Sequence, residues 1–301
     1  MQDFTMNRDG LLKISLMGGE ARAYLIEATQ MVETARRTHN LSRVATAALG
    51  RTLMATSMMG AMLKGENESL TATIKGGGPL GTVLAVGRAN GHVKGYVDYP
   101  DVDLPRVAGE HLPVGAAVGK QGSLTIVKDL GLRQPYVGQV NLVSGEIAED
   151  FAMYFTSSEQ TPSLVSLGVL VGENVISAGG LIIQMLPGAS EAAIKSVEYS
   201  ADMFRDISKT MQEYHLKDAL PQLLMHLEPE VLEELHPRYL CDCSRERMEK
   251  ALIALGRQEL VSIIEEEHEI DMDCHFCNKR RHFSEQDLRT LLEQASGGRN
   301  A

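Results

Sequence analysis

The sequence predicts an α+β fold in three parts: an N-terminal mixed-sheet domain around a buried helix, a helical linker, and a small C-terminal domain. Runs rich in β-branched residues and punctuated by glycine dominate residues 1–186 and flank one long apolar helical segment. The pattern becomes helical over residues 187–232, beginning at Pro187-Gly188. All four cysteines fall within residues 233–301, so this last part differs in composition from the other two.

Composition and charge narrow the class of protein. Hydrophobic residues make up 44% and charged residues 23% of the 301 residues, which excludes a wholly disordered chain. The net charge of −11 disfavours a nucleic-acid-binding protein, because an acidic chain repels phosphate backbones. The first residues hold no apolar signal core, and glycines and Glu173 interrupt the longest apolar tract, residues 164–186. We therefore expect a cytoplasmic protein with reduced thiols and no membrane partner.

Short strands are predicted at the start of the first domain, over residues 10–17 and 21–28, before two helices over 30–39 and 41–64. The second helix is apolar nearly all round, which is typical of a buried helix. Asn90-Gly91 predicts a type I′ hairpin turn, in which both central residues adopt positive φ. The remaining predicted elements are strands at 69–74, 80–86, 92–99, 122–129 and 136–143, a helix at 147–155 and a hairpin over 163–186.

The linker begins with Ser190 as a predicted N-cap, followed by Glu191 in a favourable first-turn position. Pro221 is expected to break the helical run. The apolar positions form one loose face and are sparse: Ile194, Val197, Met203, Ile207 and Met211. This pattern favours a linker that is ordered only while it packs on a neighbour, although a stable accessory helix pair fits the same periodicity.

Helix signals also organise the C-terminal domain. Ser244 is placed to cap a helix that ends at Leu255 and Gly256. Ser284 and Asp287 are spaced like a capping box at the start of a last helix, which is expected to run to about residue 292. Strands or a loop are expected around the third cysteine.

The four cysteines form two pairs, Cys241-x-Cys243 and Cys274-x-x-Cys277. A domain of this size has little core of its own, and a reducing compartment favours a metal over disulfides as its cross-link. Four thiolates satisfy the tetrahedral preference of Zn²⁺, so we predict one Zn²⁺ per chain. The ligand charge sums to −2, and nearby basic residues are expected to offset it: Arg245, Arg247, Lys279, Arg280 and Arg281. His275 and His282 are interpreted as bystanders.

Residue chemistry leaves two interpretations of this zinc site open. It is either a permanent structural knuckle or a switch, in which oxidation of the thiolates releases zinc and unfolds the domain. A thioredoxin-like dithiol is disfavoured because Cys274 and Cys277 lie outside any βαβ pattern. Gly76-Gly77-Gly78-Pro79 predicts a tight turn and not a phosphate loop, since no Lys-Ser/Thr pair follows it. No catalytic constellation is recognisable, so the chain is not expected to be an enzyme.

Several short motifs, in this order along nearly the whole chain, carry a family resemblance. They include Asn90-Gly91-His92-Val93-Lys94-Gly95-Tyr96, Ser158-Glu159-Gln160-Thr161-Pro162-Ser163, Gln184-Met185-Leu186-Pro187-Gly188-Ala189, Leu240-Cys241-Asp242-Cys243-Ser244 and Cys274-His275-Phe276-Cys277-Asn278-Lys279. With this order and the unusual cysteine spacing, the chain resembles the redox-regulated holdase chaperones of the 33-kilodalton heat-shock protein family.

The resemblance implies an ATP-independent chaperone that is inactive while Cys241, Cys243, Cys274 and Cys277 hold zinc. Oxidation is then expected to pair Cys241 with Cys243 and Cys274 with Cys277, expel zinc and destabilise the linker. The resemblance further implies a homodimer in the oxidised state that binds unfolding client proteins and prevents their aggregation. A thiol-disulfide oxidoreductase and a zinc-dependent RNA-binding module are the competing functions.

Overall fold

The computed structural model describes residues 8–105 and 111–297, with side chains described as far as residue 294. Its contacts divide the chain into two compact units, Met1–Leu240 and Cys241–Ala301. We call them the N-terminal and C-terminal units and describe each by itself. The predicted α+β class is confirmed, because both units combine helices with antiparallel strands.

Sheet A of the N-terminal unit is five-stranded, with the order β10-β1-β2-β9-β8. Both faces of its central strands are buried, which is why these strands carry apolar residues at successive positions. Leu181 and Ile183, for example, belong to one core cluster, and Ile182 between them belongs to another. The strands are β1 (Gly10–Leu16), β2 (Ala21–Glu27), β8 (Ser163–Val171), β9 (Val175–Met185) and β10 (Glu230–Leu235).

Sheet B is the second five-stranded sheet of this unit, with the order β5-β4-β3-β6-β7. Its residues alternate between buried and partly buried, as in Val83 and Leu84, because only one face packs on the core. The strands are β3 (Ser69–Lys75), β4 (Thr82–Arg88), β5 (Val93–Val97), β6 (Ser123–Asp129) and β7 (Tyr136–Asn141).

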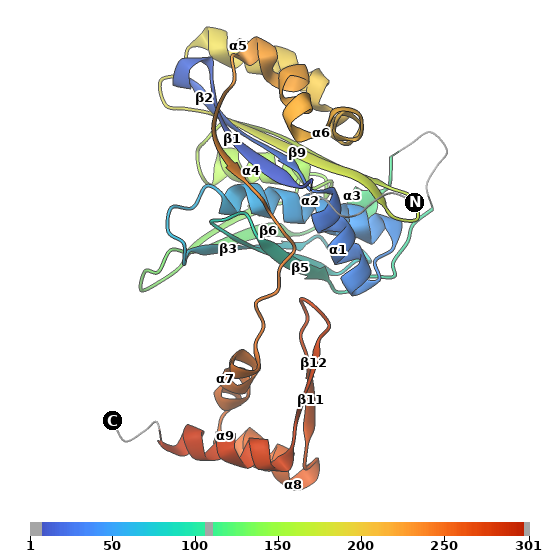
Figure 1. Ribbon diagram of the computed structural model, residues 1–301, viewed down its shortest axis with the longest axis vertical. Helices are drawn as coiled ribbons and strands as arrows, with labels where there is room; N and C mark the ends of the chain where they lie inside the picture. The colour runs from blue at the N-terminus through green and yellow to red at the C-terminus, as the bar shows by residue number, and fades with distance from the viewer. Residues whose placement is uncertain (1–7, 106–110, 298–301) are drawn as a thin grey trace. The chain divides into compact units, whose positions relative to one another are not determined.

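Helices fill the space between the two sheets (Figure 1). The predicted buried helix is confirmed as α2 (Arg43–Gly60), in which all but two residues are buried. Ser42 caps it by accepting a hydrogen bond from the backbone N–H of Ala45. The other helices of this unit before the linker are η1 (Met17–Gly19), α1 (Thr29–His39), α3 (Val114–Val118) and α4 (Ala148–Ser157).

The linker helices cover the opposite face of sheet A, so the N-terminal unit has four layers, in the order helices, sheet A, helices and sheet B (Figure 1). The elements are α5 (Glu191–Ser200), η2 (Ala201–Phe204), α6 (Ile207–Leu224) and η3 (Met225–Leu227). Ser190 caps α5 as predicted, because its side chain accepts from the N–H of Ala193.

Three local predictions are wrong. The strand pairs of both sheets are antiparallel in the described residues, whereas mixed sheets were predicted. Hairpins such as β8–β9 leave no room for the crossovers that parallel pairing needs. The turn before β5 is not type I′, because Gly91 has φ +77° but Asn90 is not in the positive-φ region. Its closing bond instead joins the N–H of Gly91 to the carbonyl of Arg88, at 2.9 Å.

Pro221 does not break the linker helix. It lies inside α6 on an exposed position, where water can replace the hydrogen bond that proline removes. The break occurs at His215 instead, with φ 52° and ψ 173°. This backbone conformation is costly for a residue other than glycine, so contacts around His215 must stabilise it.

Within residues 241–297, the C-terminal unit has three helices and one hairpin around a small core. Ser244 accepts from the N–H of Arg247 and caps α7, and Ser284 and Asp287 exchange the bonds of a capping box at α9, both as predicted. Helix α8 and strand β10 were not predicted. The elements are α7 (Arg245–Leu255), α8 (Arg257–Glu266), β11 (Ile270–Asp273), β12 (Arg280–Phe283) and α9 (Glu285–Gly297).

Candidate metal centre

The structure brings together the four cysteines that the sequence singled out. Their Sγ atoms all lie within 4.8 Å of one another. Cys241 and Cys243 come from the extended segment before α7, and Cys274 and Cys277 come from the turn between β11 and β12. Two chain segments 30 residues apart therefore converge on one point.

The turn that presents Cys274 and Cys277 is shaped by backbone hydrogen bonds. The carbonyl of Cys274 accepts from the N–H groups of Cys277 and Asn278, at 3.2 and 2.8 Å. The N–H of Cys274 donates to the carbonyl of Lys279, and Asn278 adopts φ 54° to complete the turn. Asparagine tolerates this left-handed conformation better than most residues do. Both thiols of the pair therefore lie on one side of the turn.

The donor set fits a tetrahedral thiolate site. The sulfur atoms of Cys241 and Cys274 are 3.6 Å apart, and those of Cys243 and Cys277 are 3.4 Å apart. Four sulfurs at about 2.3 Å from one Zn²⁺ would be about 3.8 Å from each other. These two distances are within about 0.4 Å of that value, and the four sulfur atoms all lie within 4.8 Å of one another. Cys274 is buried and the other three are partly exposed, so an oxidant could reach the cluster.

Burial and mutual contact shift the pKa values of three of the thiols in different directions. Burial raises the pKa of Cys241 and of Cys243. Burial also acts on Cys277, but a bond from the N–H of Lys279 and bonds from the neighbouring thiols outweigh it, so the pKa of Cys277 is lowered. Thiols this close cannot all ionise unless a cation compensates them. The cluster is therefore chemically suited to a divalent metal.

Three of the five basic residues expected to offset the cluster's charge have carboxylate partners of their own. Arg247 pairs with Asp242 at 2.6 Å, and Arg280 pairs with Asp273 at 2.9 Å. Arg245 also forms ion pairs, with two carboxylates. Charge compensation by these arginines is thus shared with neighbouring acids. The bystander His282 likewise bonds to a carboxylate, that of Asp271, at 3.0 Å.

The linker is held on the N-terminal unit by a more extensive apolar face than the sequence suggested. Val197, Ile207 and Met211 are buried as expected, but Ile194 and Met203 are 39% and 48% exposed. The anchors that sequence analysis missed lie at and beyond the end of η2 and in the second half of α6 and η3: Phe204, Leu216, Ala219, Leu223, Leu224 and Leu227. Those beyond residue 215 were missed because the kink at His215 resets the helical period, whereas Phe204 precedes the kink, at the end of η2.

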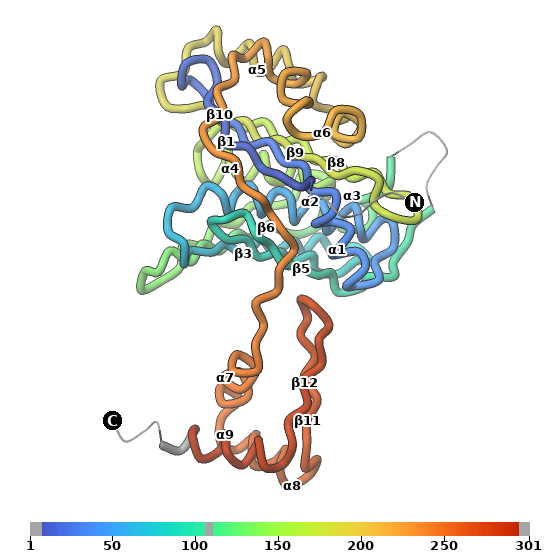
Figure 2. Tube along the Cα trace, in the orientation of Figure 1, coloured from blue at the N-terminus to red at the C-terminus, as the bar shows by residue number. Residues whose placement is uncertain are grey.

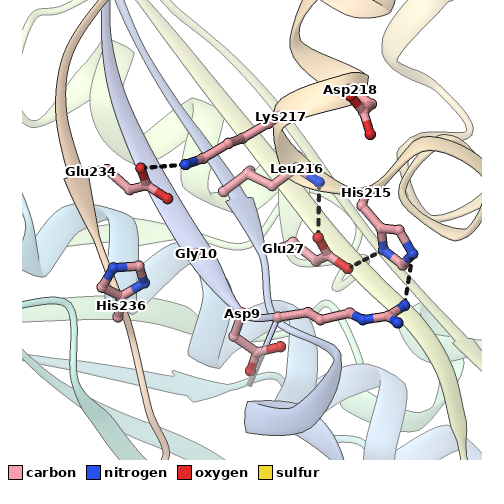
Figure 3. A pocket seen from close by; sticks show the side chains of 10 residues that line it. Asp9, Gly10, Glu27, His215, Leu216, Lys217, Asp218, Glu234 and His236 are labelled. Carbon is pink, nitrogen blue, oxygen red and sulfur yellow. Dashed lines mark hydrogen bonds and ion pairs between the residues drawn. The ribbon is translucent and has the colours of Figure 1, made fainter. Parts of the chain in front are cut away.

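A buried carboxylate holds this kink (Figure 3). Glu27, at the end of β2, accepts from the N–H of Leu216 at 2.8 Å and pairs with Nδ1 of His215 at 2.9 Å. Arg8 can only donate to Nε2 of His215, at 3.0 Å, so Nδ1 carries the proton that Glu27 accepts. The group lines a cavity of about 300 Å³. We call Glu27, His215 and Leu216 the hinge clasp.

The glycine run that could have suggested a phosphate loop is a structural turn, as predicted. Gly77 has φ +77°, and the backbone of residues 76–78 packs directly on that of residues 117–119. A Cβ atom at Gly76 would lie 2.3 Å from the carbonyl oxygen of Gly119. The glycines are therefore required by close packing of two backbone segments.

No helix within the described residues combines the length and hydropathy that crossing a membrane requires.

Comparisons with known proteins place the chain among chaperones. The model of the family described as "Hsp33 protein" matches residues 9–284, which include all four cysteines. The 33 kDa chaperonin of Alkaliphilus metalliredigens is 46% identical over 287 residues, covering 94% of this chain and 98% of the relative. That of Clostridioides difficile is 45% identical over 289 residues, covering 95% and 99%. The crystal structure of the 33 kDa chaperonin from Thermotoga maritima has a TM-score of 0.86 at 36% identity, covering 96% of this chain and 99% of that one.

Proposed function

The chain belongs to the Hsp33 family, and from that premise we propose that it is a redox-regulated, ATP-independent holdase chaperone. The observation that carries the proposal is the convergence of four sulfur atoms within 4.8 Å at the start of a small unit that follows the linker in the chain. Its proposed partners are unfolding client proteins, and its proposed location is the cytoplasm. Its functional parts are residues 1–186, 187–232 and 233–301.

In the proposed resting state, Cys241, Cys243, Cys274 and Cys277 hold one Zn²⁺. When bound, the metal supplies a cross-link between the segment before α7 and the β11–β12 turn. The apolar core of this unit is small, and Leu252, Leu260, Phe283 and Leu288 are its most deeply buried members. A unit of about 60 residues commonly needs such a cross-link to stay folded.

Activation is proposed to be an oxidation by peroxide. Cys241 pairs with Cys243, and Cys274 pairs with Cys277, as the family resemblance implies. Each pair of thiols gives up two electrons and two protons, and one hydrogen peroxide takes them up to form two water molecules. In the reduced protein each thiol also contacts one thiol of the other pair, Cys241 with Cys274 and Cys243 with Cys277. The proposed disulfides would remove all four thiolates as metal ligands, so oxidation and loss of the metal are proposed to occur together.

The linker is proposed to lose its docking when the C-terminal unit unfolds. Its helices bury one face of sheet A, including Leu12, Leu25 and Leu181. Release would expose this face together with the apolar side of α6. The exposed hydrophobic surface could bind unfolded segments and a second copy of the chain. We propose that the oxidised protein is a homodimer in this state.

A paired measurement tests the proposal. Zinc release and suppression of thermal aggregation of a client enzyme are followed together, with and without peroxide. We expect one zinc per chain to leave as protection appears, and protection to saturate at a stoichiometric amount of chaperone. Equal protection by the reduced, zinc-loaded protein would refute redox control.

An insulin-reduction assay addresses the competing enzymatic function. A thiol-disulfide oxidoreductase using Cys274 and Cys277 would turn over, whereas a holdase would not. RNA binding with a steep salt dependence would support the zinc-dependent RNA-binding alternative, against which the net charge of −11 speaks.

A further inference from the structure

The chain between β10 and the first cysteine lies along the edge of sheet B. We call residues 236–240 the edge strap; Figure 2 shows it running past β5. The N–H of Val93 donates to the carbonyl of Arg238 at 2.9 Å, and the N–H of Leu240 donates to the carbonyl of Val93 at 2.8 Å. Tyr239 and Val93 thereby form a parallel bridge. The edge strap thus occupies β5 as a short additional strand.

One aromatic side chain anchors the edge strap. The hydroxyl of Tyr239 donates to the carbonyl of Gly95 at 2.7 Å. Nε2 of His39 lies 2.8 Å from the hydroxyl oxygen of Tyr239. Because the hydroxyl proton is already donated to Gly95, His39 is the donor in this second bond. The two rings meet edge to face, with centroids 6.2 Å apart. The edge of β5 where the edge strap lies, which we call the seat, therefore accommodates an extended backbone and one aromatic side chain.

The edge strap continues a run that already covers the other sheet. Strand β10 pairs with β1 at the edge of sheet A, where Glu233 and Lys13 form an ion pair of 2.7 Å. Residues 230–240 therefore close one edge of each sheet. The run ends at Leu240, and the next residue is the zinc-site Cys241. The cover on β5 is joined directly to the part of the chain that oxidation is proposed to unfold.

We propose that the edge of β5 is a binding site for extended segments of unfolding polypeptides, and that the edge strap occupies it in the resting protein. This inference rests on the proposed function and names a place where clients bind. Free strand edges bind extended chains through main-chain hydrogen bonds, with pockets for alternate side chains. Such recognition depends little on sequence, which suits a chaperone with varied clients.

The edge can bind a longer segment than the one that covers it. Val93 and Gly95 both direct their backbone groups outward to the edge strap, and strand alternation gives Val97 the same orientation. The edge strap uses only the first two of these positions. Its advantage is that it is attached to the same chain, which gives it a high effective concentration at the seat. Once zinc no longer holds Cys241, the edge strap is less restrained at the seat, and a longer client segment can displace it.

A peptide-binding experiment on the full chain tests this inference. The probe is a fluorescent peptide of residues 235–240, and its matched control carries alanine in place of tyrosine. We expect the probe to bind the peroxide-treated protein at least tenfold more tightly than the reduced, zinc-loaded protein. The control peptide should bind the oxidised protein at least tenfold more weakly than the probe. An unlabelled unfolding client should displace the probe.

Amide hydrogen exchange gives a readout at the seat itself. The N–H of Val93 should be protected in the reduced protein, exchange faster after oxidation, and regain protection when the probe or a client is added. If oxidised protein suppresses aggregation but neither binds the probe nor changes exchange at Val93, this inference is wrong while the proposed function stands. If oxidised protein shows no protection of clients at all, the proposed function itself fails.

A substitution provides an independent test in the reduced protein. Tyr239→Ala removes the anchor and should allow probe binding without peroxide, with zinc retained. Tyr239→Phe keeps the ring and should give an intermediate increase. If both variants remain as closed to the probe as the unsubstituted protein, the edge strap does not cover a binding site. Should Tyr239→Ala prove too unstable to purify, the exchange experiment on the unsubstituted chain still decides.

Discussion

The linker and the C-terminal unit are held in place by different physical means. Seventeen buried apolar residues among those described form the core between the linker helices and sheet A, and the hinge clasp adds a buried carboxylate. The corresponding core of the C-terminal unit has nine members up to residue 294, one of which is Cys274 itself. Apolar burial thus holds the linker, whereas the C-terminal unit is proposed to depend on a metal held by its four cysteines. On that proposal, oxidation acts first on the C-terminal unit and reaches the linker second.

Removal of one ligand is expected to have the largest effect. Cys274→Ser should abolish tight zinc binding and loosen the C-terminal unit, because metal binding of roughly 10–16 kcal/mol supplies the folding energy of small zinc units. Residues 1–186 should remain folded. Zinc content and amide exchange measure both outcomes. His275→Gln is the matched control and should keep its zinc; retention of one tight zinc by Cys274→Ser would disprove the four-thiolate assignment.

A cavity in the linker core is expected to release the linker before zinc is lost, which reverses the order proposed for oxidation. Phe204 is 1% exposed beneath α6, and Phe204→Ala should weaken docking by about 3–5 kcal/mol through lost burial and an unfilled cavity. Linker peptide bonds should become sensitive to proteolysis while zinc stays bound. Met203→Ala, at a position 48% exposed, should leave the proteolysis pattern unchanged. Simultaneous loss of zinc in Phe204→Ala would mean that the two regions are not separable.

The stability of the N-terminal unit should depend on pH through buried carboxyl groups that it contains. Burial raises the pKa of Asp9 to about 7, although the N–H groups of Gln30 and Met31 donate to it, and the charge of Glu27 adds to the shift. The folded state therefore holds a proton that the unfolded chain has lost above about pH 4. It follows that the free energy of unfolding falls as pH rises from about 4 to about 7, by at most about 1.4 kcal/mol per pH unit.

Denaturant titrations of the N-terminal transition across this pH range measure the slope, and Asp9→Asn should flatten it. Glu33 acts at lower pH and in the opposite direction. Burial disfavours its charge, but bonds from Arg36, Val175 and Arg37 prevail and lower its pKa to about 2. Its contribution is lost as pH falls from about 4.5 to about 2, so the two windows separate. An unchanged slope in Asp9→Asn would exclude Asp9 as its source.

The smallest expected effect concerns the hinge clasp. Glu27→Gln leaves one of the two donors, the N–H of Leu216 or Nδ1 of His215, facing an amide N–H, at a cost of about 1–3 kcal/mol. The second half of α6 should show faster amide exchange, and peroxide should release the linker sooner. Glu191→Gln, on an exposed side chain, serves as the control. If exchange in α6 is the same in both variants, the strained conformation of His215 is held by packing alone.

Much of the fold was predictable from sequence because its signals are local. The all-round apolar pattern of residues 44–62 identified the buried helix, and Ser190, Ser244 and Ser284 marked helix starts that the structure confirms. The cysteine spacing identified a candidate metal centre whose four sulfur atoms do converge. Each of these signals depends on a few neighbouring residues or on one well-known chemistry.

The missed features depend on partners distant in the sequence. Strand β10 is acidic and mostly exposed, and it is a strand only because β1 offers an edge to pair with. The break in α6 lies at His215 and not at Pro221. Glu27, nearly 190 residues earlier, accepts the hydrogen bond of the Leu216 N–H that the break leaves without a helical partner. No window of local sequence contains both halves of such an interaction.

The amino-acid sequence alone thus determined the α+β class, the buried helix, the helix caps and the four cysteines of the candidate metal centre, since periodicity, capping and thiol chemistry act over short distances. Only the tertiary structure decided how firmly the linker docks, where it bends, and what covers the edges of the two sheets. Those properties arise when side chains far apart in the chain share one core or one hydrogen-bonding group, and such sharing exists only after the chain has folded.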